Sequence, residues 1–117
     1  LDAAEQEESL AQGLLAFMYL KGDGVEADAD SAEGWARRAA EQGNEFGWFV
    51  LGSLYLSGSG VEQDLPAAWA YLDMADGRDI VDAEELKEEA WEKMSKKERQ
   101  RAAGLRNRWT EERVLPR

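Results

Sequence analysis

The sequence contains no cysteine and no histidine, and it has only two prolines. Without cysteine the chain has no disulfide framework, no thiolate zinc site and no cysteine nucleophile. Without histidine it lacks the usual acid–base group near neutral pH and the commonest metal ligand. We therefore expect no enzyme, no metal and no cofactor. The scarcity of proline favours helices over a turn-rich β fold.

Long hydrophobic runs are also missing. The stretch Leu14–Leu20 is apolar, but it falls well short of the roughly 18–20 residues that span a bilayer, so we expect no transmembrane segment. The 117 residues suffice for a single domain, and 44% hydrophobic with 33% charged residues is an ordinary soluble composition. Because the chain begins with Leu1, we expect that upstream residues were removed, and a cleaved secretory signal is one possibility.

The net charge of −11 is unevenly distributed along the chain. Residues 1–92 carry 22 acidic and 5 basic side chains, a net −17, whereas residues 93–117 carry 9 basic and 3 acidic ones, a net +6. An acidic body repels nucleic acid and attracts basic partners, so we expect no nucleic-acid binding. The basic tail either packs on the acidic body or binds a partner, and the sequence leaves both interpretations open.

The chain repeats itself after 36 residues. A helical pattern, a loop with two glycines and a second helical pattern recur in the same order, which is the mark of a repeat array. The aligned pairs are Leu15 and Leu51, Tyr19 and Tyr55, Leu20 and Leu56, Gly22 and Gly58, Gly24 and Gly60, Val25 and Val61, Glu26 and Glu62, Asp28 and Asp64, Ala32 and Ala68, and Ala39 and Ala75.

Each part of the repeat has a physical reason. Leu51 and Tyr55 lie four residues apart and belong to one apolar stripe of a helix. Gly58 and Gly60 end that helix, because glycine tolerates the positive φ angles of a tight turn. Asp64 stands where the next helix begins, so its carboxylate can accept from the exposed backbone N–H groups. The sequence therefore predicts two similar helix pairs.

A third helix pair follows without the two-glycine loop. Ser95 and Glu98 match a capping box, and Asp82 with Glu85 suggests another cap. This pair is expected to close the array and shield its last apolar face. The predicted fold is all-α, a short right-handed superhelix of three antiparallel helix pairs. Its helices are expected near residues 3–21, 30–43, 45–57, 65–76, 82–94 and 96–112.

These residues resemble the Sel-one-like repeat family, a relative of the tetratricopeptide repeats. The resemblance covers about residues 8–77, and the G-x-G-V-x-x-D element carries most of it. It implies one domain over 1–117, with repeats at about 8–43 and 44–79 and a capping pair at about 80–113. The chain departs from the family pattern at Ala16, Gly47, Tyr71 and Asp76. The residues that match the family pattern are Ala11, Leu15, Tyr19, Gly22, Gly24, Val25, Asp28, Ala32, Trp35, Ala39, Ala40 and Gly43 in the first unit, and Leu51, Gly52, Tyr55, Gly58, Gly60, Val61, Asp64, Ala68 and Ala75 in the second.

The resemblance also implies a function as an adaptor or scaffold that binds another protein, with an extracytoplasmic bacterial location slightly favoured. In tetratricopeptide repeats the first helix of each pair lines the concave face. Transferring that register places an apolar groove with an acidic rim on this chain, which suits a peptide or helix with a basic or amphipathic segment. The alternative is that the chain's own third helix pair covers these side chains. The expected groove residues are Phe17, Leu20, Lys21, Phe46, Phe49, Ser53 and Leu56.

Other readings of the sequence remain. Within the class of binding proteins, a small acidic chain also suits a toxin-neutralising immunity protein. A second class is purely architectural, in which the repeats form part of a larger chain. Gly22 and Gly24 do not indicate a phosphate site, because no strand precedes them and they recur at Gly58 and Gly60.

Overall fold

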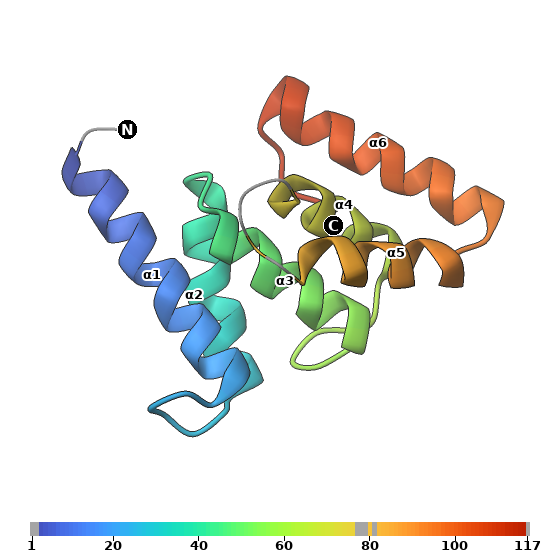
Figure 1. Ribbon diagram of the computed structural model, residues 1–117. Helices are drawn as coiled ribbons and strands as arrows, with labels where there is room; N and C mark the ends of the chain where they lie inside the picture. The colour runs from blue at the N-terminus through green and yellow to red at the C-terminus, as the bar shows by residue number, and fades with distance from the viewer. Residues whose placement is uncertain (1–2, 77–79, 81, 117) are drawn as a thin grey trace.

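The computed structural model describes residues 3–76, 80 and 82–116 of the chain (Figure 1). These residues form helices and no strand, as the sequence predicts, and the observed helix ends differ from the predicted ones by only one or two residues. Residue 79, the expected end of the second repeat, lies outside the described residues. The helices are α1 (Ala3–Lys21), α2 (Ala29–Glu41), α3 (Glu45–Ser57), α4 (Leu65–Ala75), α5 (Ala83–Lys93) and α6 (Lys96–Glu112).

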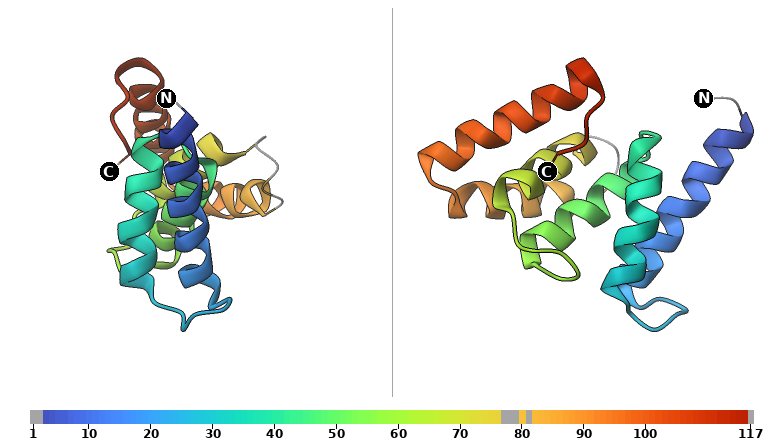
Figure 2. Two further views of the ribbon diagram at one scale, coloured as in Figure 1. Left: turned by 90° about the vertical axis from the view of Figure 1, so that its left-hand side faces the viewer. Right: turned by 180° about the vertical axis from the view of Figure 1, so that it is seen from behind.

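The helices stack as consecutive antiparallel pairs, α1 with α2 and α3 with α4. In Figure 1, α1 lies in front of α2 and α5 lies in front of α4. The view from behind in Figure 2 shows α2 and α4 in front instead. The third pair is arranged differently, because both α5 and α6 pack against α4. The chain is therefore a short all-α solenoid in which each pair packs on the pair before it.

The two loops confirm the 36-residue repeat at the level of single hydrogen bonds. The backbone N–H of Asp28 donates to the carbonyl of Tyr19 at 3.0 Å, and that of Asp64 donates to Tyr55 at the same distance. Gly24 and Gly60 both adopt positive φ, 77° and 72°. An L side chain is strained in that conformation, so the turn requires glycine at both positions.

Small residues bring neighbouring helices close together. A Cβ added at Gly47 would lie 2.6 Å from the backbone nitrogen of Ala40 and 2.8 Å from the carbonyl oxygen of Ala36. One added at Gly52 would lie 2.7 Å from Cγ of Leu72. Because α3 approaches α2 at the first position and α4 at the second, these two glycines set the spacing on both sides of α3.

The hydrophobic core is continuous from the first repeat to the last helix. Tyr55 and Tyr71 stack in parallel with centroids 5.9 Å apart, and Trp48 of α3 meets Trp109 of α6 edge-on at 5.8 Å. The indole N–H of Trp48 donates to the carbonyl of Ala40, which ties the same ring to α2. These aromatic contacts join the first pair, the second pair and the last helix in one packed unit.

Side-chain caps begin most of the helices. Asp28, Asn44 and Asp64 accept from backbone N–H groups in the first turns of α2, α3 and α4. The capping box predicted at Ser95 and Glu98 is confirmed. The cap predicted at Asp82 is wrong. Its backbone is helical, with φ −85° and ψ −9°, and it makes no side-chain capping bond, because a cap requires extended backbone.

The basic C-terminal segment packs on the acidic body. Arg101 of α6 donates to both carboxylate oxygens of Asp64, at 3.1 and 3.4 Å, and Arg106 donates to Asp73 at 2.9 Å. Both arginines thus bind carboxylates of the second repeat. The sequence left open whether the basic tail packs on the acidic body or binds a partner. For Arg101 and Arg106, the structure shows packing on the body.

Candidate partner-binding face

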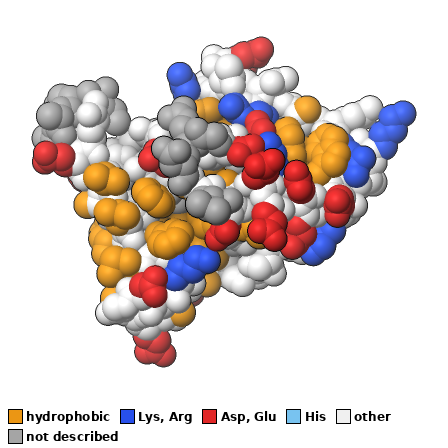
Figure 3. Space-filling model, viewed as in Figure 1, with side chains coloured by type: hydrophobic (Ala, Val, Ile, Leu, Met, Phe, Trp, Pro, Cys, Tyr) orange, Lys and Arg blue, Asp and Glu red, His pale blue; other side chains and the backbone are white. Residues whose placement is uncertain are grey.

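An exposed hydrophobic stripe runs along α1. Leu10 and Leu14 are 46% and 43% exposed, and Phe17 beside them is half-buried. The three residues lie at i, i+4 and i+7, so they share one side of the helix. Hydrophobic side chains gather over α1 and the middle of this face, whereas acidic side chains gather over α4 and α5 (Figure 3). Contiguous exposed apolar surface of this kind is typical of a binding site.

Three phenylalanines continue the stripe from α1 to α3. The ring of Phe17 meets Phe46 edge-on at 5.8 Å between centroids and lies 6.0 Å from Phe49. The ammonium of Lys21 lies 5.7 Å from the centroid of Phe17. One side of the cluster is packed against the core, and the half-buried rings of Phe17 and Phe46 keep part of their surface open.

Gly13 permits this close approach of α1 and α3. The side chain of Asn44 caps α3 by accepting from the N–H groups of Phe46 and Gly47, at 2.9 and 3.1 Å. A Cβ at Gly13 would collide with the side-chain oxygen of Asn44. The missing side chain on α1 therefore lets the capped start of α3 lie against α1 and places Phe46 beside Phe17.

The structure divides the predicted groove residues into two groups. Phe17, Leu20, Phe46 and Ser53 are half-buried and Lys21 is exposed, whereas Phe49 and Leu56 are only 2% and 7% exposed. Both residues of the second group lie beneath the surface, and Phe49, which packs beside Phe17, forms the floor of the face. The hydroxyl of Ser53 donates to the carbonyl of Phe49 at 2.9 Å, so its donor is already used within α3.

The third helix pair covers one end of the predicted groove. Leu56 is packed with Ala90 and Leu86 of α5, which remove it from solvent. The alternative stated for the groove, coverage by the chain's own third pair, therefore holds at Leu56. At the other end, the expected groove residues did not include Leu14. Its spacing of four from Leu10 and three to Phe17 was the signal that would have found it.

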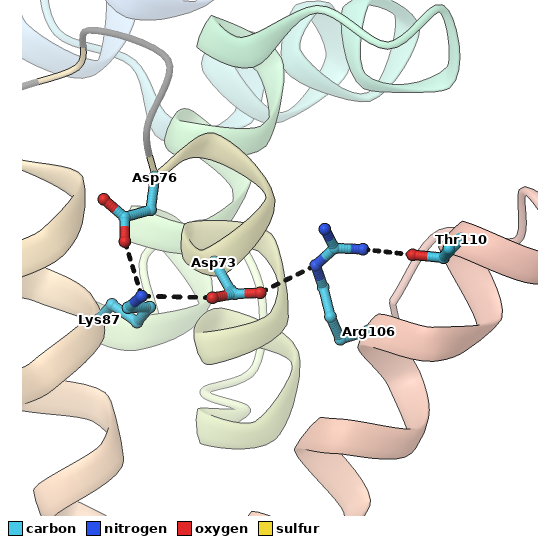
Figure 4. Close-up of polar contacts among 5 residues, drawn as sticks. All are labelled: Asp73, Asp76, Lys87, Arg106 and Thr110. Carbon is cyan, nitrogen blue, oxygen red and sulfur yellow. Dashed lines mark hydrogen bonds and ion pairs between the residues drawn. The ribbon is translucent and has the colours of Figure 1, made fainter.

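The side of the face formed by α5 is acidic. Its glutamates at positions 84, 85, 88, 89 and 92 are all exposed. Asp73 and Asp76 of the neighbouring α4 end are instead paired with two cations. Lys87 lies 3.2 Å from Asp73 and 2.6 Å from Asp76, and Arg106 lies 2.9 Å from Asp73 (Figure 4). Partial burial lowers the pKa of Lys87, but its hydrogen bonds to Asp76 and Asp73 outweigh that effect and raise it above its ordinary value. The remaining negative charge at this end comes from the exposed glutamates of α5.

The described part of the chain shows no group of three or more Asp or Glu side chains arranged to hold a metal ion. Its helices are also too short or too polar to cross a membrane. The features that stand out on this face are an apolar stripe, an aromatic cluster and an acidic side. Interfaces between proteins generally combine an apolar, aromatic centre with a polar rim.

Comparisons with known proteins identify the repeat. The family model described as Sel1 repeat matches residues 9–44 and 49–75. One solved structure that matches is a protective antigen present in uropathogenic Escherichia coli strains and displaying an SLR fold. It is 36% identical, superimposes with a TM-score of 0.78 and matches 93% of this chain. The chain spans 24% of that protein's length. A search of curated proteins finds no match.

The family match rests on the features that the structure displays. The matched segments contain both two-glycine loops, both capping aspartates and most of the helix pairs that they join. The resemblance inferred from the sequence is thus confirmed, and with it the all-α repeat fold. The chain belongs to the Sel1 repeat family of helical protein-interaction modules.

Proposed function

We propose that this module binds a basic, amphipathic segment of another protein along α1 and the start of α3. The observation that carries the proposal is the pair of exposed leucines, Leu10 and Leu14, continuous with Phe17 and Phe46. Aromatic side chains, phenylalanine among them, are enriched in protein interfaces. An apolar stripe along one helix suits the apolar side of a partner helix or peptide.

The charge of the partner follows from the acidic side of the face. The glutamates of α5 are exposed, acidic side chains gather to one side of the hydrophobic area (Figure 3), and residues 1–92 carry a net −17. Opposite charges across an interface speed association and reject partners of the wrong sign. A segment with leucine-like residues on one side and lysine or arginine on the other matches both parts of the face. We propose a binding function rather than catalysis, because the face presents no acid–base pair.

A pair of synthetic helical peptides tests this proposal. The two peptides share one leucine side and differ only in their polar side, lysine in the first and glutamate in the second. Binding is followed by fluorescence anisotropy of the labelled peptide. We expect the lysine peptide to bind at least about tenfold more tightly than the glutamate peptide, with an affinity that falls as salt rises. Equal binding of both peptides would contradict the acidic part of the proposal.

Variants of the chain locate the bound peptide. Leu10→Ser with Leu14→Ser should weaken the lysine peptide by about tenfold or more, since hot-spot truncations at such anchors cost above ~1 kcal/mol. Ala103→Ser, at an exposed position of α6, is the control and should leave binding unchanged. A photo-reactive side chain at position 14 can then identify the natural partner. Unchanged binding by the leucine variant would place the peptide elsewhere and remove the proposed face.

A further inference from the structure

A small recess lies where the end of α6 meets α3 and α4. Its volume is about 140 Å³, which gives room for a few water molecules at roughly 30 Å³ each. It is too small for a cofactor or a drug-sized ligand, since such ligands occupy pockets of roughly 300–1,000 Å³. We call it the α6 recess. The described residues that line it are Trp48, Met74, Arg106, Trp109, Thr110 and Arg113.

The lining of the α6 recess is basic, although the chain as a whole is acidic. Two of the described lining residues are arginines and none of them is acidic, whereas the whole chain carries a net −11. The acids that follow Thr110 in α6, Glu111 and Glu112, do not line the recess. A carboxylate oxygen of Glu112 lies 3.8 Å from Nε of Arg108. The recess is therefore a local positive site on a negative molecule.

Arg106 contributes oriented hydrogen-bond donors to the recess. Its Nε donates to Asp73 at 2.9 Å, and one terminal nitrogen donates to the hydroxyl of Thr110 at 2.7 Å. A guanidinium has more N–H donors than these two bonds use, so further donors remain for a ligand. The charge of Arg106 is offset by Asp73, which does not itself line the recess. Arg106 thus adds geometry more than net charge.

Arg113 contributes the charge that is not offset. It ends α6 with φ 58° and ψ 32°, and among the described residues other than glycine it alone has a positive φ. Glycine or asparagine usually occupies such a position, because other side chains are strained there. The guanidinium carbon of Arg113 lies 5.3 Å from the centroid of the Trp109 ring, and its nitrogens form no ion pair with any described residue. Backbone strain of this kind clusters at binding and catalytic sites.

We propose that the α6 recess binds the carboxylate of a short aliphatic acid. Arg113 pairs with the carboxylate through its planar fork, and Arg106 donates from its remaining N–H groups. Because Asp73 offsets Arg106, about one positive charge is left, which matches a carboxylate better than a phosphate group of about −1.5 to −2. Trp109 and Met74 supply apolar surface for a short stem. The acid is either a free small molecule or an acidic side chain of another protein, and both sources offer the same chemistry.

Titration of the full chain with sodium propionate tests the proposal. The five tryptophan indole N–H signals are followed by two-dimensional NMR, with the ionic strength held constant by chloride. The signals of Trp48 and Trp109 should shift and saturate with a dissociation constant of about 1–10 mM, because a ligand of few atoms binds weakly. Those of Trp35, Trp69 and Trp91, which do not line the recess, should stay in place. Equal shifts of all five signals, or shifts that do not saturate by about 100 mM, overturn the proposal.

Three further ligands test the chemistry of the site. Propionamide has the shape of propionate without its charge and should cause no shift at the same concentrations. Inorganic phosphate should bind more weakly than propionate. Binding of propionamide equal to that of propionate, or tighter binding of phosphate, overturns the assignment to a carboxylate. N-acetylglutamate α-amide carries the same group on a peptide-like stem, so tighter binding than propionate indicates a protein side chain as the source and weaker binding indicates a free acid.

Arg113→Gly removes the proposed pairing group. Glycine suits the left-handed backbone at this position, so the variant is expected to keep the fold and the melting temperature of the parent. Its dissociation constant for propionate should rise at least about tenfold, since the charge-assisted bonds are lost. Arg108→Gln is the matched control, because Arg108 lies in the same helix and does not line the recess. Parental binding by Arg113→Gly, or an equal loss in Arg108→Gln, overturns the proposal.

The α6 recess shares no residue with the stripe on α1, so the two proposals are tested independently. Leu10→Ser with Leu14→Ser should bind propionate like the parent. Arg113→Gly should in turn bind the lysine peptide like the parent. Failure of the recess and failure of the α1 face therefore give different results.

Discussion

Arg106 of α6 donates from Nε to one carboxylate oxygen of Asp73 on α4, at 2.9 Å. Lys87 of α5 donates to the other oxygen of the same carboxylate at 3.2 Å (Figure 4). A second guanidinium nitrogen of Arg106 reaches the hydroxyl of Thr110 at 2.7 Å, which fixes its orientation along α6. One carboxylate of the second repeat therefore anchors both helices of the third pair.

Asp73→Asn should loosen this anchor. The variant removes the negative charge that both cations share and preserves the size of the side chain. The groups involved are only 21–29% exposed, so we expect a loss of about 1 kcal/mol in the free energy of unfolding, above the median for surface pairs. Urea unfolding followed by circular dichroism measures it. Asp82→Asn is the control, because Asp82 makes no side-chain capping bond and should change stability very little.

Lys87 should make stability depend on alkaline pH. Its folded pKa is raised above the ordinary value of 10.5, because its hydrogen bonds to Asp76 and Asp73 outweigh partial burial. With a raised folded pKa, the contribution of Lys87 to the free energy of unfolding is fully present below the pKa of the unfolded state. It is lost as pH rises through the pKa of the folded state. The difference in unfolding free energy between the parent and Lys87→Met should be constant from neutral to mildly alkaline pH and shrink above 10.5. A difference that grows there would show the opposite sign of shift.

Local chemistry made much of this fold predictable from the sequence. The backbone carbonyls of Tyr19 and Tyr55 accept equivalent hydrogen bonds, because the same glycines and aspartates follow each tyrosine at the same spacing. The capping box at Ser95 depends on four consecutive residues and was found correctly. Such features are fixed by neighbours in the chain, so their pattern is visible without any knowledge of tertiary packing.

The packing of the third pair was not predictable in the same way. Asp73 contacts Lys87 and Arg106, which lie 14 and 33 positions further along the chain. Both partners belong to the third helix pair, which does not share the 36-residue repeat. The coverage of Leu56 by α5 also depends on how that helix packs on α4. Transferring a groove register from a regular array therefore placed Leu56 on the surface, although α5 covers it.

Gly47→Ala should destabilise the junction between the first and second repeats. The added methyl group would lie 2.6 and 2.8 Å from backbone atoms of Ala40 and Ala36, which cannot move as a side-chain end can. We expect a loss of about 1–3 kcal/mol in the free energy of unfolding, as for other overpacked cores. Gly34→Ala is the matched control on α2, because no atom lies within 4 Å of its added Cβ. That change should stabilise the chain by up to about 1 kcal/mol through helix propensity.

Phe49→Ser and Leu14→Ser should separate the floor of the α1 face from its surface. Phe49 is 2% exposed and packs in the core, so its truncation should cost about 3–5 kcal/mol, with a further cost for the buried hydroxyl. That is a large part of the roughly 5–15 kcal/mol that stabilises a domain, and the variant is expected to melt far below the parent. Leu14 is 43% exposed, and its replacement should change stability by no more than about 0.5 kcal/mol.

Comparing both variants in the peptide assay distinguishes loss of binding from loss of fold. Leu14→Ser should keep the parental circular-dichroism spectrum and melting temperature while binding the lysine peptide more weakly. Phe49→Ser should lose helicity and peptide binding together, because the floor supports the rings of Phe17 and Phe46. If Leu14→Ser were as destabilising as Phe49→Ser, Leu14 would be buried in solution and could not serve as a free anchor. If Phe49→Ser instead kept its fold and lost only the peptide, Phe49 would contact the partner directly.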